Sequence, residues 1–351
     1  MKTLKKLVRA QNAARKHHKY SRWYTRELRS LLGHDWAMFY ALLGGRMTGK
    51  SYAITDYICN QKRKKGSAVK AYWLRISETS TKAMLANKAE KLVDPDLQRK
   101  YNLELSTKGM KVFNRGEMFM TVAPLSAMAK LKGVAFFDKD FAGEYIIVLD
   151  EFQLEQGEKR TSFDILYNFV GMIENIARTT KNKIRIFLVG NTLEEASSIL
   201  KAFNFLPEGF GRFYLRRKRC IIDNIEPTEE YIKDRQGSAA DILGGGEMSN
   251  YTNEIRKDLS LICKDRLINP QYTIRFGKNR DSIFLVWSNN VITRYKGQPV
   301  KSSIAMKPYL DQLYNLERRQ EVLDQFDARA YKFDTLITLS YFQGELQKIR
   351  K

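Results

Sequence analysis

The sequence has 351 residues, of which 43% are hydrophobic, and its formal net charge at pH 7 is +22. This length favours two domains. No apolar run is long enough to cross a membrane, and the first residues lack the apolar segment of a secretory signal, so we expect a cytoplasmic protein. The positive charge favours a polyanionic partner, which is either a nucleic acid or an anionic membrane surface.

Cysteine and histidine usage narrows the chemistry further. The three cysteines, Cys59, Cys220 and Cys263, are far apart and form no CxxC pair. Neither a zinc site nor a disulfide framework is therefore expected. All three histidines lie before residue 35, which excludes histidine catalysis in the rest of the chain.

The first 35 residues are predicted to form a basic arm. Leu4, Leu7 and Ala10 have the spacing of one helix face, and lysines and arginines surround them. Such an arm is suited to contact a nucleic acid or a neighbouring subunit. The apolar run at 36–44 then predicts a buried parallel strand, and residues 51–65 predict a helix that ends at Gly66.

Strands and helices alternate in the following part of the chain. The predicted elements are a strand at 68–76, a helix at 81–93, a β-hairpin meander at 103–122, a strand at 144–152, a helix at 162–180 and a strand at 183–192. Turns of the meander are expected at Lys108-Gly109 and Arg115-Gly116. This alternation predicts an α/β domain at 36–224 with a mainly parallel, doubly wound sheet.

A change in composition separates this domain from the rest of the chain. Residues 225–254 are acidic and contain the run Gly244-Gly245-Gly246, which indicates a linker. Residues 255–351 are predicted to form a smaller α+β domain. Its expected elements are three short strands within 271–297 and helices at 307–326 and 332–351.

The sequence GGRMTGKS at 44–51 matches the phosphate-loop pattern G-x4-G-K-S in full, after a predicted strand and before a predicted helix. Glycines let backbone N–H groups point at a phosphate, and the helix adds its positive N-terminus. Lys50 is expected to reach the β- and γ-phosphates of ATP, and Ser51 to bind Mg²⁺. The residues predicted to bind the nucleotide are Gly44, Gly45, Arg46, Met47, Thr48, Gly49, Lys50 and Ser51. The alternative is a glycine-rich turn without a ligand.

Two acids, Asp150 and Glu151, follow the apolar residues of the 144–152 strand. If this strand lies beside the phosphate-loop strand, Asp150 can hold Mg²⁺ through its water shell. Glu151 can then orient and deprotonate the attacking water. Hydrolysis needs this second acid, whereas a phosphate-loop kinase does not. The alternative is a solvated strand end that carries two acids.

Three further residues are candidates for catalysis. Asn191 follows the 183–192 strand, where an amide can contact both the γ-phosphate and the water and so respond to hydrolysis. Arg178 ends the long predicted helix and can reach the γ-phosphate of a neighbouring subunit as an arginine finger, or it can simply complement the helix dipole. Lys132 is a weaker candidate of the same kind, and a solvated lysine is the alternative.

Together these features resemble the DNA-packaging motor ATPases of small short-tailed phages, which are related to terminase large subunits and to ring DNA translocases with an additional catalytic glutamate. The similarity covers roughly residues 36–211 and, more faintly, 283–287. The matching segments are GGRMTGKS (44–51), YWLR (72–75), PLS (124–126) with Lys132 after it, VLDEF (148–152), Arg178 and GN (190–191).

The resemblance implies a motor that uses ATP and Mg²⁺ to move double-stranded DNA into a preformed capsid. It implies a ring of identical subunits at the phage portal, with a pentamer as the expected ring, and a structural prohead RNA as a further candidate partner. No membrane partner is implied, and the expected location is the host cytoplasm, transiently on the prohead. Arg178 would be the trans-acting finger, and Lys132 would couple neighbouring subunits.

In that family the second domain resembles a ribonuclease-H-type nuclease that has lost its site. The predicted central strands QYTIRF and IFLVW carry no carboxylates, and Asp281 stands just outside them. A two-metal nuclease needs several converging carboxylates, so no DNA cleavage is expected.

Several alternative functions stay open on the sequence alone. They are a packaging terminase with an active nuclease, another DNA-dependent ATPase or helicase-like translocase, a phosphate-loop kinase or nucleotide transferase, and a nucleotide-dependent assembly protein without turnover. Basic residues of the meander (Lys108, Lys111, Arg115) and of the segment 62–65 are candidates to follow DNA phosphates, or they are solvated turn charges.

Overall fold

The structure is a computed structural model that describes most of the chain. The described residues are 24–45, 47–127, 140–152, 164–176, 183–190, 197–207, 209–229, 231, 233, 242, 259–267, 270–276, 282–295, 307–311 and 316–350. The contacts divide the chain into two compact units, Met1–Phe203 with Gly209–Ile255 and Asn204–Glu208 with Arg256–Lys351. Each unit is described by itself.

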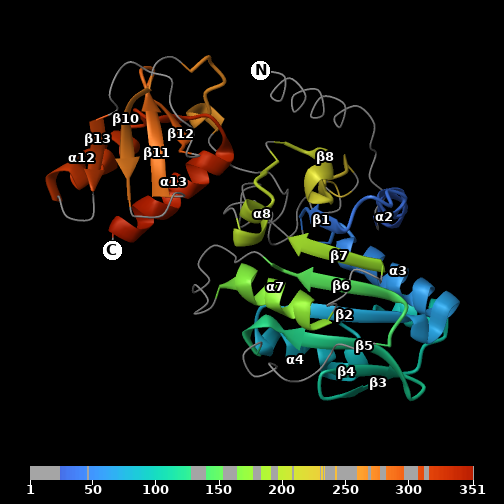
Figure 1. The fold of residues 1–351 in the computed structure, drawn as a ribbon. Coiled ribbons are helices and arrows are strands. Elements are labelled where there is room, and N and C mark those ends of the chain that lie inside the picture. The colour runs from blue at the N-terminus through green and yellow to red at the C-terminus, as the bar shows by residue number, and fades with distance from the viewer. Residues whose placement is uncertain are drawn as a thin grey trace. The chain divides into compact units, whose positions relative to one another are not determined.

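The first unit is built on a nine-stranded sheet with the strand order β3-β4-β5-β2-β6-β7-β1-β9-β8 (Figure 1). The strands from β5 to β9 in this order are all parallel, while β3, β4 and β8 are antiparallel to their neighbours. The prediction of a mainly parallel sheet is therefore confirmed. The strands are β1 (Phe39–Leu43), β2 (Val69–Arg75), β3 (Leu105–Lys108), β4 (Lys111–Asn114), β5 (Glu117–Pro124), β6 (Glu144–Asp150), β7 (Lys183–Gly190), β8 (Gly211–Leu215) and β9 (Cys220–Asn224).

Helices connect the parallel strands, and side-chain caps fix where several of them begin. The helices are α2 (Thr25–Leu32), α3 (Lys50–Lys65), α4 (Glu78–Ala89), α5 (Pro95–Tyr101), α7 (Ile165–Ile176) and α8 (Ser198–Ala202). The Ser77 hydroxyl accepts from the backbone N–H of Ser80 at the start of α4, and Asp94 accepts from Asp96 ahead of α5. Helix α3 ends at Gly66, as predicted.

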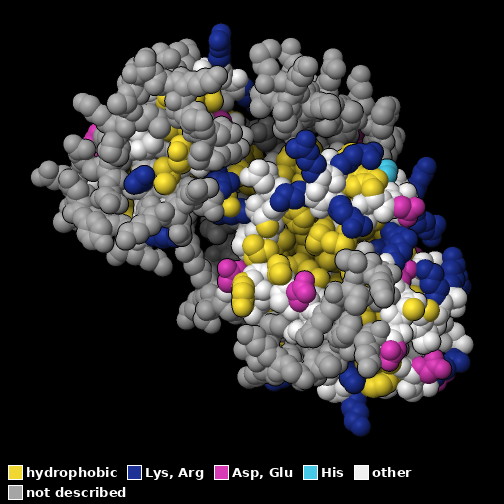
Figure 2. Space-filling model, viewed as in Figure 1, with side chains coloured by type: hydrophobic (Ala, Val, Ile, Leu, Met, Phe, Trp, Pro, Cys, Tyr) yellow, Lys and Arg dark blue, Asp and Glu magenta, His cyan; other side chains and the backbone are white. Residues whose placement is uncertain are grey.

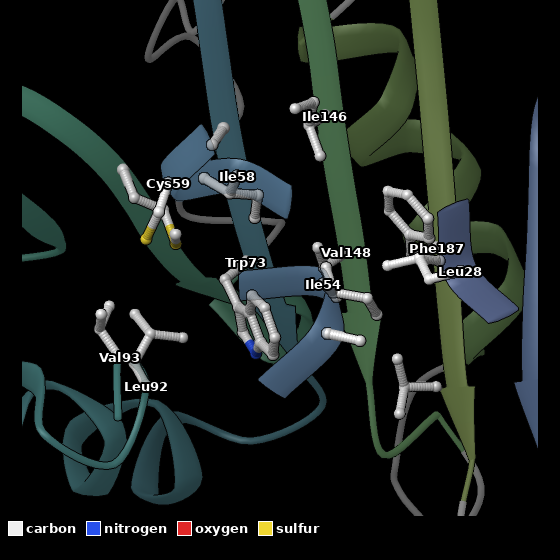
Figure 3. Packing of buried hydrophobic residues seen from close by; sticks show 14 of the residues in the cluster. Leu28, Ile54, Ile58, Cys59, Trp73, Leu92, Val93, Ile146, Val148 and Phe187 are labelled. Atoms are coloured by element: carbon white, nitrogen blue, oxygen red, sulfur yellow. The ribbon is translucent and has the colours of Figure 1, made fainter. Parts of the chain in front are cut away.

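The main core lies between α3 and one face of the sheet. Ile54 and Ile58 of α3 pack with Trp73 of β2, Val148 of β6 and Phe187 of β7, all of which are fully buried (Figure 3). Side chains alternate along a strand, so the even-numbered residues of β6, Asp150 included, point to this face. Asp150 is thereby directed towards the side of the sheet on which α3 begins.

Some local predictions are confirmed and others are wrong. The meander turns are confirmed, because Gly109 and Gly116 both have positive φ angles, of 59° and 83°. Helix α4 begins earlier than predicted, at the Ser77 cap, and its backbone leaves helical geometry at Ala86, Asn87 and Lys88. Helices α5 and α8 and strands β8 and β9 were not expected from the sequence.

The second unit contains a five-stranded sheet with the order β13-β10-β11-β12-β14, and the three predicted strands are confirmed. Residues Lys307–Asp311 were expected to be helical, but they form a strand parallel to β10, which gives β10 a backbone partner on its second side. The aromatic residues Phe284, Phe333 and Phe342 meet in its core. The elements are β10 (Pro270–Arg275), β11 (Ile283–Trp287), β12 (Val291–Arg294), β13 (Lys307–Asp311), β14 (Lys332–Phe333), α12 (Leu316–Asp327) and α13 (Leu336–Ile349).

In the part of the chain that the structure describes, none of the helices has the length and apolar character needed to cross a membrane.

A buried ion pair links the edge of the large sheet to the segment that leads into α2. Arg212 of β8 donates to Asp223 of β9 at 3.2 Å, and these side chains are only 2% and 0% exposed. The Tyr24 hydroxyl donates to the same carboxylate, and Arg212 also contacts the Ser30 hydroxyl at 3.2 Å. Breaking a buried pair leaves one charge without compensation, which is strongly destabilising.

Arg212→Ala is therefore expected to lower the free energy of unfolding by about 3–5 kcal/mol, measured by urea denaturation. Arg99→Ala is the matched control, because Arg99 pairs with Asp96 on the exposed surface of α5. An exposed pair contributes at most about 1 kcal/mol. Equal effects of the two substitutions would contradict a stabilising role for the buried pair.

Candidate nucleotide site

The predicted phosphate loop lies between β1 and α3, as the sequence pattern requires. The backbone N–H of Gly44 donates to the Gly190 carbonyl at the end of β7, at 3.2 Å. Gly49 has a φ of 83°, and α3 begins directly after it at Lys50. This left-handed conformation suits glycine and turns the chain from the loop into the helix. Loop and helix therefore meet at the helix N-terminus, where the first N–H groups have no partner within the helix.

Gly44 is also held against the segment that follows β9. The Ile225 N–H donates to the Leu43 carbonyl at 2.7 Å. A Cβ atom at Gly44 would lie 3.1 Å from Ile225 Cβ and 3.4 Å from the Thr48 hydroxyl. A larger residue at this position would therefore require Ile225 to shift slightly, which favours glycine. Sequence reasoning did not identify Ile225, because its contact with the loop depends on the pairing of β1 with β9.

Lys50 is buried, and its ammonium group lies inside the loop. Its Nζ atom donates to the carbonyls of Gly44 and Gly45, at 2.8 and 2.7 Å, and to the Thr48 hydroxyl at 3.1 Å. Burial lowers the pKa of Lys50 to about 7, although the negative charges of Asp150 and Glu151 oppose this shift. The three N–H donors of the lysine are all used within the loop, so a phosphate oxygen there would take the place of a loop acceptor.

Asp150 is the last residue of β6 and lies at the carboxyl ends of the parallel strands, as the loop does. The strand order corrects one expectation, because β7 lies between β6 and β1, so that the two strands are not adjacent. Asp150 is paired in register with Val189 of β7, which is in turn paired with Leu42 of β1. At about 4.8 Å per strand, the two backbones are about 10 Å apart, a gap that side chains and an ion can bridge.

Two residues of β2 contact Asp150. The indole N–H of Trp73 donates to its carboxylate at 3.3 Å, and Arg75 Nε lies 3.6 Å from the same oxygen. Burial raises the pKa of Asp150 to about 6, while the charge of Arg75 acts in the opposite direction. Sequence reasoning assigned no role to Trp73 or Arg75. The pairing of Leu74 with Leu149 brings the carboxyl end of β2 beside Asp150.

Glu151 follows directly and has a different environment. Its φ angle is 52°, and its side chain is about half exposed and forms an ion pair with Arg75 Nη1. A positive φ is uncommon for glutamate, and such strained residues gather at functional sites. Arg75 thus contacts both carboxylates, of which one is buried and the other is accessible to water.

Some of the predicted site residues lie within the described part of the structure, and the others lie outside it. Ser51 is the second residue of α3, and the Met47 side chain is 72% exposed at the loop surface. The loop residues, Lys50, Asp150 and Glu151 are brought to one edge of the sheet. The predictions for Arg46, Lys132, Arg178 and Asn191 fall outside the described residues.

The residues present are chemically suited to a nucleotide and Mg²⁺. The loop packs closely against Ile225 at Gly44, and it joins a lysine to a helix N-terminus, as a triphosphate site requires. Mg²⁺ prefers oxygen ligands and keeps several waters, so the hydroxyl of Ser51 and the carboxylate of Asp150 are sufficient protein ligands. Across the described ranges, no group of three His, Cys, Asp or Glu side chains forms a separate metal cluster.

Two proteins of known structure have a similar fold. The "Phi-29 viral genome packaging motor assembly" has a similar structure, with a TM-score of 0.63, 19% identity and coverage of 94% of this chain and 100% of the other. The "Phi-28 gp11 DNA packaging Motor" has a TM-score of 0.56 and 13% identity, with coverage of 91% and 95%. At these identities the likeness concerns the fold.

The family follows from a match to a family model, whereas the other comparisons contribute less. The N-terminal domain of the DNA packaging ATPase from bacteriophage phi29 is 21% identical, covers 56% of this chain and 93% of its own, and has a TM-score of 0.45. No curated protein matches the sequence. Residues 20–332 match the family described as "Podovirus DNA encapsidation protein (Gp16)". Because this match spans most of the chain, the protein belongs to the podovirus Gp16 family of DNA encapsidation proteins.

Proposed function

We propose that this chain is an ATP-hydrolysing motor subunit that drives double-stranded DNA into a preformed phage capsid. Its family is one of DNA encapsidation proteins, and its relatives of known structure are packaging motors. The observation that carries the ATPase assignment is the meeting of a lysine-bearing phosphate loop with Asp150 and Glu151 at one edge of the sheet.

Each residue of the site has a distinct task in this proposal. The loop N–H groups, the N-terminus of α3 and Lys50 bind the phosphates, while Ser51 and Asp150 hold Mg²⁺. The bound ion supplies charge neutralisation on the phosphate oxygens. Glu151, which is accessible to water, accepts a proton from the attacking water. Arg75 positions both carboxylates through its two ion pairs.

The remaining candidates complete the site between subunits. We propose that Arg178 acts as an arginine finger on a neighbouring subunit's nucleotide, that Lys132 couples the subunits, and that Asn191 responds to the γ-phosphate. These roles require a ring, for which a pentamer at the portal is the proposed form, in the host cytoplasm and transiently on the prohead. A structural prohead RNA is a further proposed partner.

The proposed division of labour follows the domain boundaries expected from the sequence. The arm at 1–35 contacts nucleic acid or a neighbour, except for Tyr24 and α2, which pack into the core of the first unit. Residues 36–224 hydrolyse ATP, residues 225–254 connect the two domains, and residues 255–351 bind DNA, portal or RNA. We propose that the last domain resembles a ribonuclease-H-type nuclease without activity. In support, β10 and β11 contain no acidic residue. A two-metal nuclease places carboxylates on such central strands.

DNA-stimulated ATP hydrolysis tests this function directly. Purified full-length protein is expected to release phosphate from ATP in the presence of Mg²⁺, faster when duplex DNA is added, and to leave plasmid intact with Mn²⁺. Stimulation only by a small phosphate acceptor would favour a kinase instead. Linearised or nicked plasmid would overturn the proposed absence of nuclease activity.

A further inference from the structure

The hairpin that joins β8 to β9 carries four consecutive cations where turn chemistry gives no reason for them. Leu215 pairs with Cys220, so the whole connection consists of Arg216, Arg217, Lys218 and Arg219. All four side chains are exposed. Arg219 has the left-handed angles φ 50° and ψ 38°. Glycine or asparagine is usual in such a position, and an arginine here lowers the stability of the fold. A function of this arginine would explain why it is present.

The turn is held in place by the segment before β1. The Arg219 carbonyl accepts from the N–H groups of Met38 and Phe39 at 2.8 and 2.9 Å, and its Nε donates to the Trp36 carbonyl at 3.2 Å. The Arg216 guanidinium lies over the Trp36 ring, 5.0 Å from its centroid. The backbone of the turn is therefore fixed to the strand framework.

Aromatic side chains pack beside the cations of the turn. His34 contacts the rings of Tyr214 and Trp36, with centroids 5.2 and 6.1 Å apart. Burial lowers the pKa of His34, and the positive charges of Arg212 and Arg216 add to this effect. Arg216 lies over Trp36, so this ring positions a cation, while the Tyr214 side chain is 42% exposed.

The positive charge of the turn is not neutralised within the described part of the chain. No carboxylate among the described residues pairs with any of the four cations, and the only acid in the adjoining segment 33–39, Asp35, pairs with Lys183 at 3.6 Å. Figure 2 shows Lys and Arg side chains gathered on the part of this unit that carries β8 and α2. Exposed, unpaired cations on a fixed backbone are suited to phosphodiester groups.

The turn lies far from the nucleotide site. Cys220, which follows it, pairs with Phe39 at the start of β1, whereas the phosphate loop follows the end of β1. Five residues at about 3.3 Å each place the two regions about 16 Å apart along the strand. The turn therefore does not bind the nucleotide, and its fixed backbone does not depend on the state of the phosphate loop.

We propose that Arg216–Arg219, supported by Trp36, form a site for the phosphate backbone of duplex DNA that works independently of ATP. Duplex DNA is the occupant because the family encapsidates DNA and because the site presents four exposed cations, which suit the phosphates of a duplex. The proposal rests on the DNA-packaging function, but not on ATP hydrolysis. Contacts of this kind are independent of base sequence and strongly dependent on salt.

The test compares two full-length variants in DNA binding without nucleotide. Arg217→Ala with Lys218→Ala removes two exposed cations of the turn, of which only Lys218 makes a contact, to the Ala202 carbonyl. Lys82→Ala with Lys91→Ala removes the same charge from exposed positions that have no proposed contact with DNA. Binding of a labelled blunt duplex is measured by fluorescence anisotropy over a range of salt concentrations.

The salt slope is the steepness with which the logarithm of the duplex affinity falls with the logarithm of the salt concentration. The turn variant is expected to reduce this steepness by about 1.8, because each lost phosphate contact reduces it by about 0.9. At 0.15 M salt this corresponds to an affinity loss on the order of 30-fold. The same loss is expected with ATP and Mg²⁺ present, and the charge-conserving pair Arg217→Lys with Lys218→Arg is expected to bind as wild type.

Three results would overturn the proposal. They are a slope and affinity equal to those of the Lys82 and Lys91 control, failure of the charge-conserving pair to bind, and a loss confined to an RNA hairpin with the same number of phosphates. A protein that hydrolyses no ATP but shows the expected DNA loss would instead contradict the ATPase assignment alone.

Discussion

Glu151→Gln is expected to reduce ATP turnover by about 10²–10⁴-fold while ATP binding is retained. Glutamine has nearly the same shape as glutamate but cannot accept the proton of the attacking water. The residue does not contact the phosphate loop in the described structure, and its side chain is about half exposed beside Arg75. Phosphate release with duplex DNA measures turnover, and equilibrium binding of a fluorescent ATP analogue measures affinity.

The matched control is Glu90→Gln, which makes the same change at an exposed position after α4. It is expected to hydrolyse ATP like wild type. If Glu151→Gln kept turnover within about tenfold of wild type, the proposed role of Glu151 as the proton acceptor would be wrong. If it lost ATP binding as well, Glu151 would have a structural role in the loop rather than a role in hydrolysis.

The elements around the site could be predicted from the sequence because their signals are local. The apolar run before Gly44, the loop pattern and the stop at Gly66 all lie within one short segment, and β1 and α3 are found where they were expected. In the same way, the apolar residues before Asp150 identified β6. Hydrophobic runs and glycines are governed by neighbouring residues, so a single sequence is sufficient to recognise them.

The neighbours of the site could not be predicted, because they depend on strand order. Nothing local in the sequence indicates that β7 lies between β6 and β1, or that β2 lies on the other side of β6. Arg75 and Trp73 reach Asp150 only through that order. Likewise, Ile225 contacts Gly44 only because β9 pairs with β1. Long-range pairing of this kind leaves no periodic signal in either segment.

The prediction of a helix at 307–326 was partly wrong for a related reason. Its first part, Lys307–Asp311, pairs with β10 as a strand, and only the part from Leu316 is helical. The apolar residues Tyr309 and Leu310 are compatible with either period, and a short segment cannot decide between the two. The partner strand decided the outcome, as tertiary context often does for short elements.

Asp150→Asn is expected to stabilise the protein at pH 8 by about 1–3 kcal/mol while it abolishes ATP hydrolysis. Burial raises the pKa of this carboxyl to about 6 from an ordinary value of 3.8. The folded state thus binds the proton more tightly than the unfolded state does. The resulting stabilisation is complete below pH 3.8 and is lost as the pH rises through 6, so above pH 6 the ionised carboxylate destabilises the fold.

Asparagine removes this buried charge and can still accept the indole N–H of Trp73. It loses the charge that holds Mg²⁺, however, so greater stability and lost turnover are expected in the same variant, as is common at strained functional sites. Urea denaturation without nucleotide at pH 8 and at pH 4 measures the first effect. The gain is expected at pH 8 and should largely disappear at pH 4, where wild-type Asp150 is protonated in the folded state.

Asp35→Asn serves as the control, because this carboxylate is 85% exposed and pairs with Lys183 at 3.6 Å. Its removal is expected to change stability by less than about 1 kcal/mol at either pH. A loss of stability in Asp150→Asn at pH 8 would show that the ion pair with Arg75 outweighs the desolvation of the carboxylate. In that case the β2–β6 contact would stabilise the fold in addition to positioning the acid for Mg²⁺, because a net favourable buried pair is lost when one partner is removed.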